Sequence, residues 1–158
     1  MKIKYFFTII FIFSLLLSAC GFKPIYKETY ERISIDYHPI LISENSMIIT
    51  QMFNNFFSNE DRNSNLKLEV IISEKKIPVI TNSDGTVSKY KVEVYITFNL
   101  IDKTSEKSLY SDFTRGSAQY NVQVNEYDTE LKFEESQKTA TSNALQLIPI
   151  KIENFQSQ

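Results

Sequence analysis

Residues 89–100 read KYKVEVYITFNL, and this stretch decides the fold class. Every even-numbered position from Tyr90 to Leu100 is apolar, whereas the odd-numbered positions are mostly polar or charged. Successive side chains of a strand point to opposite faces of a sheet. The alternation therefore predicts a strand in a sheet that is covered on one face and wetter on the other.

Two earlier segments alternate in the same way. Residues 33–38 predict a short strand that Pro39 ends, and residues 66–73 predict a second strand whose continuation Pro78 interrupts. Between the second strand and the 89–100 strand, residues 82–85 read Asn-Ser-Asp-Gly, which is a turn signal.

A fourth strand is predicted after a hairpin loop at residues 102–107. Leu109 and Phe113 are expected on its inner face, but from Ala118 onward the apolar residues move to even positions. Such a switch reverses the faces of a strand unless an extra residue is absorbed. We therefore expect a β-bulge at Gly116.

A first helix is predicted over residues 43–59, with Ser43 as a plausible N-cap and Glu44 in the first turn. Its apolar residues recur at spacings of three and four: Ile48, Ile49, Met52, Phe53, Phe56 and Phe57. An exposed stripe of this kind could bind lipid. Such periodicity more often marks a face buried in the core, and we expect core.

A second helix is predicted over residues 129–148, capped by Asp128 or Thr129. Pro149 has no N–H to donate to the carbonyl of Leu145, so this helix should kink or stop there. Its narrow inner stripe consists of Phe133, Gln137, Ala140, Ala144, Leu147 and Ile148.

The order β-α-β-β-β-α predicts an α+β fold in a single domain, residues 33–158. Strands and helices that are each apolar on one face should pack in two layers. We expect a two-layer sandwich, with two helices on one face of a four-stranded mixed, mostly antiparallel sheet. The first two strands are joined through a helix, so they could be parallel.

The first 19 residues have the three-part layout of a secretory signal peptide. Two lysines lie among the first four residues, residues 5–17 form an uncharged apolar run, and Leu-Ser-Ala-Cys ends at Cys20, the only cysteine. This ending resembles the lipobox of bacterial lipoproteins. The resemblance implies cleavage before Cys20 and acylation of its thiol and of the new amino terminus.

An uncleaved transmembrane helix is the alternative for this segment. The hydrocarbon core of a bilayer needs about 20 apolar residues, and the run at residues 5–17 is shorter. A lone cysteine can also be a buried apolar residue or a reactive thiol. The place of Cys20 at the end of the signal argues against both.

Residues 20–32 are predicted to be an extended, lipidated tether. Gly21 is flexible and Pro24 is stiff, while Phe22 and Tyr26 could rest at the level of the lipid headgroups.

Composition argues against several classes of function. The chain has 17 basic and 19 acidic residues, a formal net charge of −2, which argues against non-specific nucleic-acid binding. His38 is the only histidine and has no cysteine or carboxylate cluster near it in the sequence. No nucleophile elbow, P-loop or dinucleotide motif is present. We expect no metal site, no enzyme and no cofactor beyond the covalent lipid on Cys20.

Residues 20–26, Cys-Gly-Phe-Lys-Pro-Ile-Tyr, resemble the Cys-Gly-Phe-x-Pro-Leu-Tyr start of the alphaproteobacterial LPS-assembly lipoproteins, the LptE family. Ile25 departs conservatively from the usual leucine. The family fold is two helices packed on a four-stranded sheet, the architecture predicted above. In the tether the resemblance is one of sequence motif, whereas in the rest of the chain it is one of the order of strands and helices.

The resemblance implies a location, partners and a function. Members of the family sit in the outer membrane with the domain inserted into the lumen of the LptD β-barrel. They plug the barrel, assist its assembly and help to move lipopolysaccharide (LPS) to the outer leaflet. Gly21 is consistent with this location, because in bacterial lipoproteins an aspartate at that position favours retention in the inner membrane.

Lipopolysaccharide is anionic, so contacts with it require lysine or arginine side chains that converge. Lys89, Lys91 and Arg115 lie on or beside predicted strands and are the candidates. Taken singly, each such residue is more often an ordinary solvated surface residue.

Two other hypotheses remain open. Another periplasm-facing lipoprotein adaptor, of the transport-auxiliary or secretin-pilot type, would share the signal and the size but bind a different partner. A lipid-tethered periplasmic enzyme would need a pocket with perturbed titratable groups.

Overall fold

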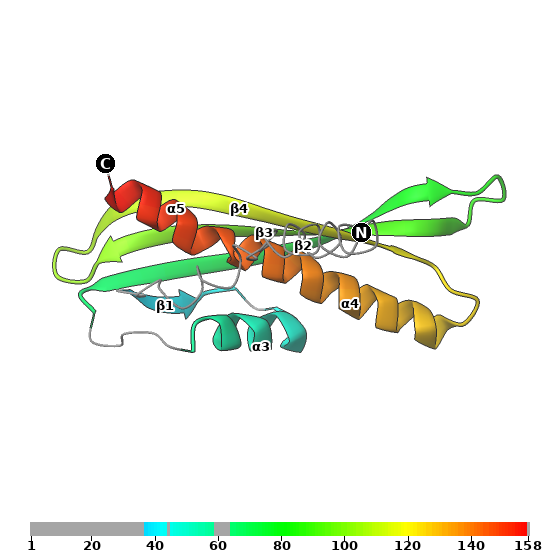
Figure 1. Ribbon diagram of the computed structural model, residues 1–158, viewed down its shortest axis with the longest axis horizontal. Coiled ribbons are helices and arrows are strands. Elements are labelled where there is room, and N and C mark those ends of the chain that lie inside the picture. Colours follow the sequence, from blue (N-terminus) through cyan, green and yellow to red (C-terminus); the bar gives the residue numbers. More distant parts are fainter. Residues whose placement is uncertain (1–36, 44, 59–63, 158) are drawn as a thin grey trace, which may run out of the picture. The chain divides into compact units, whose positions relative to one another are not determined.

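The structure, a computed structural model, describes residues 37–43, 45–58 and 64–157, which belong to one compact unit. The predicted signal peptide and the tether at residues 20–32 lie outside the described residues. The described elements follow the order β1, α3, β2, β3, β4, α4, α5 (Figure 1). None of these helices is long and apolar enough to cross a membrane.

The four strands form one mixed sheet in the order β1–β2–β3–β4. β1 (His38–Leu41) pairs in parallel with β2 (Leu66–Thr81), and β2, β3 (Val87–Asp102) and β4 (Lys107–Asn121) pair antiparallel. The predicted fold class is confirmed, including the parallel first pair.

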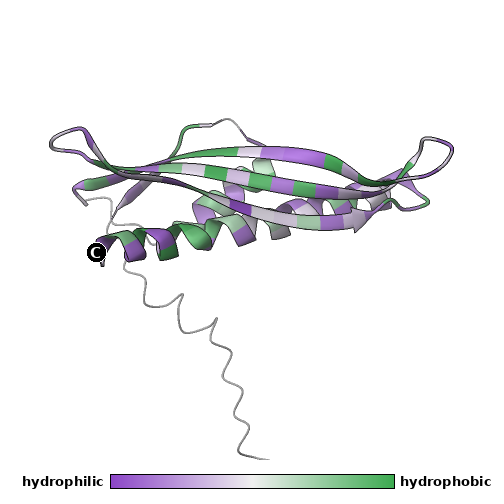
Figure 2. Ribbon diagram, turned by 90° about the horizontal axis from the view of Figure 1, so that it is seen from above, coloured by the Kyte–Doolittle hydropathy of each residue, from purple (hydrophilic) through white to green (hydrophobic). Residues whose placement is uncertain are grey.

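The helices lie on one side of the sheet (Figure 2). They are α3 (Met47–Phe56), α4 (Glu126–Leu145) and α5 (Leu147–Gln156). The core fills the space between the two layers. It contains the even-numbered side chains of β3 from Val92 to Leu100, as the alternation predicts.

The apolar stripe of the first helix belongs to this core, as predicted. Ile49, Phe53 and Phe57 are buried, while Met52 and Phe56 are partly buried and pack against them. The stripe of α4 and α5 is also confirmed for its central members, Gln137, Ala140, Ala144 and Ile148. Leu147 is 40% exposed, contrary to prediction.

β1 begins later than predicted and contains Pro39, which was expected to end the strand. The N–H of Ile42 donates to the carbonyl of Val70 at 2.8 Å. Since backbone N–H groups alternate in direction along a strand, position 39 faces the open edge of the sheet. An edge strand tolerates a proline there because no ladder hydrogen bond is lost. Residues 33–36 lie outside the described residues.

Ser43 does not cap the first helix. Its hydroxyl accepts hydrogen bonds from the N–H of Ile72 in β2 (2.8 Å) and from the amide of Asn45 (2.7 Å). Ile72 lies just beyond the part of β2 that pairs with β1, so Ser43 satisfies a donor that β1 does not reach. The N-cap is instead Ser46, whose hydroxyl accepts from the N–H of Ile49.

β2 continues through Pro78, which was expected to interrupt it. Pro78 lies opposite Tyr90, and the register shifts between Pro78 and Ile80, so the proline sits at an irregularity near the end of the hairpin. The predicted turn at residues 82–85 is confirmed. Gly85 has a φ of +87°, a conformation that favours glycine.

β4 has no change of face at Gly116. The register is regular there, with Gly116 opposite Val94, and even-numbered side chains face the helices from Tyr110 onward. The irregularity of this strand lies at Leu109, between the pairs Leu100–Tyr110 and Ile101–Ser108. Phe113 therefore lies on the opposite face and is 60% exposed, whereas Leu109 lies at the irregularity and is 43% exposed, so neither is the inner-face residue that was expected. A Cβ on Gly116 would lie 1.9 Å from the carbonyl oxygen of Ala140. Glycine is needed here for the close approach of α4, not for a bulge.

The last predicted helix is two helices. α4 begins earlier than expected, because the side chain of Asn125 accepts from the N–H of Asp128 at 3.1 Å and acts as the N-cap. Asp128 and Thr129 therefore lie inside the helix. α4 ends at Leu145, and α5 follows with Pro149 in its first turn, where a missing N–H is tolerated.

Candidate functional site

The face of the sheet away from the described helices, which we call the open face, carries a band of cations. We call it the basic band; its members are Lys75, Lys89, Lys91 and Arg115. The strand register places these four side chains in four successive rows across β2, β3 and β4. Same-face neighbours along a strand are about 7 Å apart, so the band extends for about 20 Å.

Glu93 lies among these cations and is only 3% exposed. We call Glu93, together with the three side chains that donate hydrogen bonds to it, the hub. The carboxylate of Glu93 accepts hydrogen bonds from Lys91 Nζ (2.6 Å), from the Tyr95 hydroxyl (2.6 Å) and from the Arg115 guanidinium. These donors, Lys91 foremost, lower the pKa of Glu93 to about 2. Glu93 therefore stays ionised and holds Lys91 and Arg115 in fixed positions.

The ring of Tyr95 organises the same end of the band. Arg115 Cζ lies 5.4 Å and Lys75 Nζ lies 5.6 Å from the ring centroid, both within cation–π range. Within the described ranges, no carboxylate forms an ion pair with Lys75 or Lys89. Four cations and one carboxylate leave the band with a net charge of +3.

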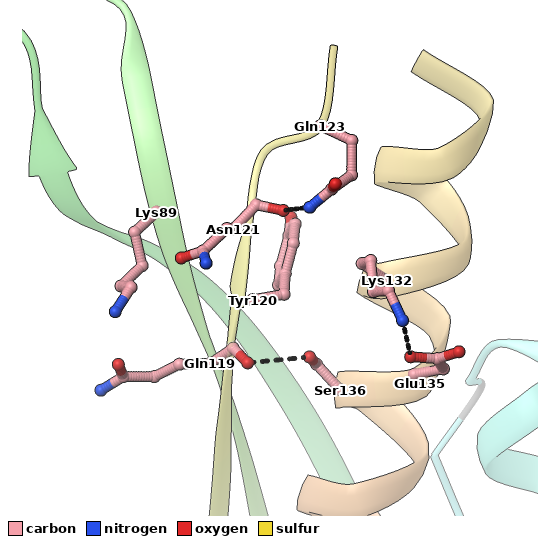
Figure 3. A pocket seen from close by; sticks show the side chains of 8 residues that line it. All are labelled: Lys89, Gln119, Tyr120, Asn121, Gln123, Lys132, Glu135 and Ser136. Carbon is pink, nitrogen blue, oxygen red and sulfur yellow. Dashed lines mark hydrogen bonds and ion pairs between the residues drawn. The ribbon is translucent and has the colours of Figure 1, made fainter. Parts of the chain in front are cut away.

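Lys89 also lines a polar pocket of about 340 Å³ at the β4 edge (Figure 3). Gln119 and Asn121 line it from β4, and Lys132 and Ser136 line it from α4. The Ser136 hydroxyl donates to the carbonyl of Gln119 at 3.4 Å, which ties the helix to the strand edge. Amides beside an ammonium group suit a ligand that carries both hydroxyl groups and negative charge.

The arrangement offers binding groups. The band and the pocket supply ammonium, guanidinium, phenol and amide groups, which bind anions and sugar hydroxyls. In the part of the chain that the structure describes, no three His, Cys, Asp or Glu side chains gather as metal ligands.

The structure brings the three candidates from the sequence onto one surface. Lys91 and Arg115 meet at a shared carboxylate, and Lys89 lies one row away. Sequence reasoning missed Lys75, Glu93 and Tyr95 as members of the site. The β2–β3 hairpin carried a signal for Lys75, which lies opposite Glu93, but the register of β4 shifts at Leu109 and cannot be read from its loop.

The protonation of Glu93 should appear in the pH dependence of stability. The pKa of Glu93 is depressed in the folded protein from 4.5 to about 2, so its contribution is present above about pH 4.5 and is lost as the pH falls through about 2. We expect the urea midpoint of the wild type to fall more steeply between pH 4.5 and 2 than that of Glu93→Gln. Equal slopes for the two proteins would show that the hub is not formed.

Comparison with known proteins gives a fold likeness. No protein-family model and no curated protein matches the sequence. A predicted lipoprotein from Caulobacter crescentus CB15 has a TM-score of 0.62 at 12% identity, over 82% of this chain and 96% of its own. Rare lipoprotein B from Shewanella oneidensis has a TM-score of 0.53 at 14% identity, over 76% and 98%. An uncharacterized lipoprotein B from Nitrosomonas europaea has a TM-score of 0.56 at 14% identity, over 77% and 83%. At these identities the likeness shows the fold alone.

Proposed function

We propose that the chain is an outer-membrane lipoprotein, anchored through Cys20, that acts by binding rather than by catalysis. In this proposal it is the partner of an LptD-type barrel, which it plugs and helps to assemble, and it assists the transport of lipopolysaccharide to the cell surface. The observation that carries the proposal is the basic band on the open face of the sheet.

The band has the chemistry that an anionic glycolipid requires. Phosphate and carboxylate groups bind most strongly to positioned lysine and arginine donors, and Glu93 positions two of them. The chain as a whole is acidic, so a net positive charge on one face is a local feature rather than a consequence of composition. Long-range attraction of an anionic ligand to this face follows.

Two further observations support the proposal. The sequence at residues 20–26 resembles the start of the LPS-assembly lipoproteins, and the architecture agrees with the fold of that family. The solved structures with the same fold come from proteins described as lipoproteins. A small rigid domain with a polar sheet face also suits the polar interior of a membrane barrel.

Removal of the two unpaired cations should weaken lipopolysaccharide binding. We expect Lys75→Gln/Lys89→Gln to raise the Kd for purified lipopolysaccharide at least about tenfold, because each charged hydrogen bond contributes about 1.5–3 kcal/mol. Neither residue touches Glu93 by a hydrogen bond, so the hub should remain intact.

The matched control is Lys107→Gln/Lys138→Gln, which also removes two positive charges but outside the band. Its Kd should stay within about twofold of the wild type. Equal weakening in both double variants would mean that binding follows total charge, and the band would then not be the lipopolysaccharide site.

A further inference from the structure

α4 has the opposite charge to the basic band. It carries five carboxylates, Glu126, Asp128, Glu130, Glu134 and Glu135, against two lysines. Two of the carboxylates pair within the helix, Glu135 with Lys132 at 2.7 Å and Glu134 with Lys138 at 3.9 Å. Among the described residues, Glu126 and Glu130 form no ion pair. The N-terminal half of α4 therefore presents negative charge to the solvent.

Three large apolar side chains interrupt this acidic surface. Val124 is fully exposed just before the N-cap, Tyr127 is 71% exposed and Leu131 is 41% exposed. The four-residue spacing places Tyr127 and Leu131 in one line along the helix, and Val124 lies at the same end of α4, ahead of its N-cap. We call this set the apolar strip. It points away from the sheet, because the buried side of α4 carries Gln137 and Ala140 instead.

Carboxylates border the apolar strip on both sides. At 100° per residue, Glu130 and Glu134 fall on one side of the line through Tyr127 and Leu131, and Asp128 and Glu135 fall on the other. Contiguous exposed apolar side chains with a polar rim mark interaction surfaces on soluble domains. The charge of the rim then decides which partner fits.

We propose that the apolar strip docks onto a partner protein whose contact surface carries lysine or arginine side chains around an apolar patch. An anionic lipid surface does not fit, because the carboxylates bordering the strip would repel it. The inference rests on the proposed function, in which this partner is the barrel. The domain would thus use two surfaces of opposite charge, the basic band for the anionic glycolipid and the apolar strip for protein.

The test uses the full-length lipoprotein in its own cells. The strip variant is Tyr127→Ser/Leu131→Ser, and the matched control is Leu109→Ser/Phe113→Ser, which removes two exposed apolar side chains from β4. Each protein is purified from outer membranes in mild detergent, and the ratio of barrel to lipoprotein is measured. We expect at least a fivefold loss of barrel for the strip variant and no loss for the control.

A photoreactive amino acid placed at position 131 or at position 113 provides an independent readout. We expect the yield of cross-links to the barrel to be at least fivefold higher from position 131 than from position 113. If the wild type retains the barrel and the strip variant retains it equally, the inference is overturned while the proposed function stands. If position 131 cross-links to lipid rather than to the barrel, the inference is also overturned. If no barrel co-purifies with the wild-type protein, the proposed partner and the inference are both wrong.

Discussion

Gly116→Ala should destabilise the domain by about 3 kcal/mol or more. An added Cβ would lie 1.9 Å from the carbonyl oxygen of Ala140 and 2.8 Å from the backbone N of Ala144. Both atoms belong to the backbone of α4, so no flexible side chain can move aside. Overpacking of a core commonly costs about 1–3 kcal/mol, and a clash with helix backbone belongs at the upper end or beyond.

The direction of the stability change distinguishes a clash with α4 from the usual effect of replacing glycine by alanine. Alanine in place of glycine within a strand normally stabilises by about 0.5–1 kcal/mol, because glycine loses more conformational entropy on folding. Urea unfolding followed by circular dichroism measures the change, with Ser117→Ala, the next residue on the open face, as the control. A midpoint for Gly116→Ala equal to or above that of the wild type would contradict the packing of α4 on β4.

If the protein is anchored in the outer membrane as proposed, Cys20→Ser should abolish that location. The serine variant offers no thiol for acylation, so the fatty chains that would hold the protein on the bilayer are never attached. Each buried CH₂ contributes about 0.8 kcal/mol to anchoring, and two or more chains make it stable. We expect the outer-membrane fraction to fall from nearly all of the protein to almost none on a sucrose gradient.

The control for this experiment is Ser18→Ala, which replaces one small residue with another ahead of the expected cleavage site and should leave the fractionation unchanged. If the Cys20→Ser protein still sediments firmly with the outer membrane, some other feature anchors the chain. Mass spectrometry of the native protein adds a direct check, since the mature amino terminus should be an acylated Cys20.

The regular parts of the fold could be predicted because their physical signals are local. The alternation at residues 89–100 defines the buried face of β3, and the three- and four-residue spacing defines the buried face of α3. The turn at Asn82–Gly85 is favoured by the types of its own residues. None of these features depends on a distant part of the chain.

The errors arose where a distant contact decides the local structure. Ser43 bonds to a strand 29 residues away instead of capping the next helix. Pro39 is tolerated because β1 is an edge strand, a fact set by the order of the sheet. Gly116 is a packing site for α4, and two exposed apolar residues, Leu109 and Phe113, suggested the wrong face for β4.

The cations of the candidate site could be predicted from the sequence, but the buried carboxylate of Glu93 at its centre could not. The need for converging cations pointed to Lys89, Lys91 and Arg115, which the structure places on one face. The burial of Glu93 depends on cross-strand neighbours, which a single strand does not reveal. Its role follows only from the register that sets Lys75 and Ser117 beside it.

The function proposed for the chain is that of a lipoprotein that serves the transport of lipopolysaccharide to the cell surface. The most direct measurement is to deplete the protein in its own cells and to quantify lipopolysaccharide at the surface and in the inner membrane over time. We expect surface lipopolysaccharide to fall while the inner-membrane pool rises. Surface lipopolysaccharide that stays at its normal level after the protein is gone would rule out a role of the protein in this transport.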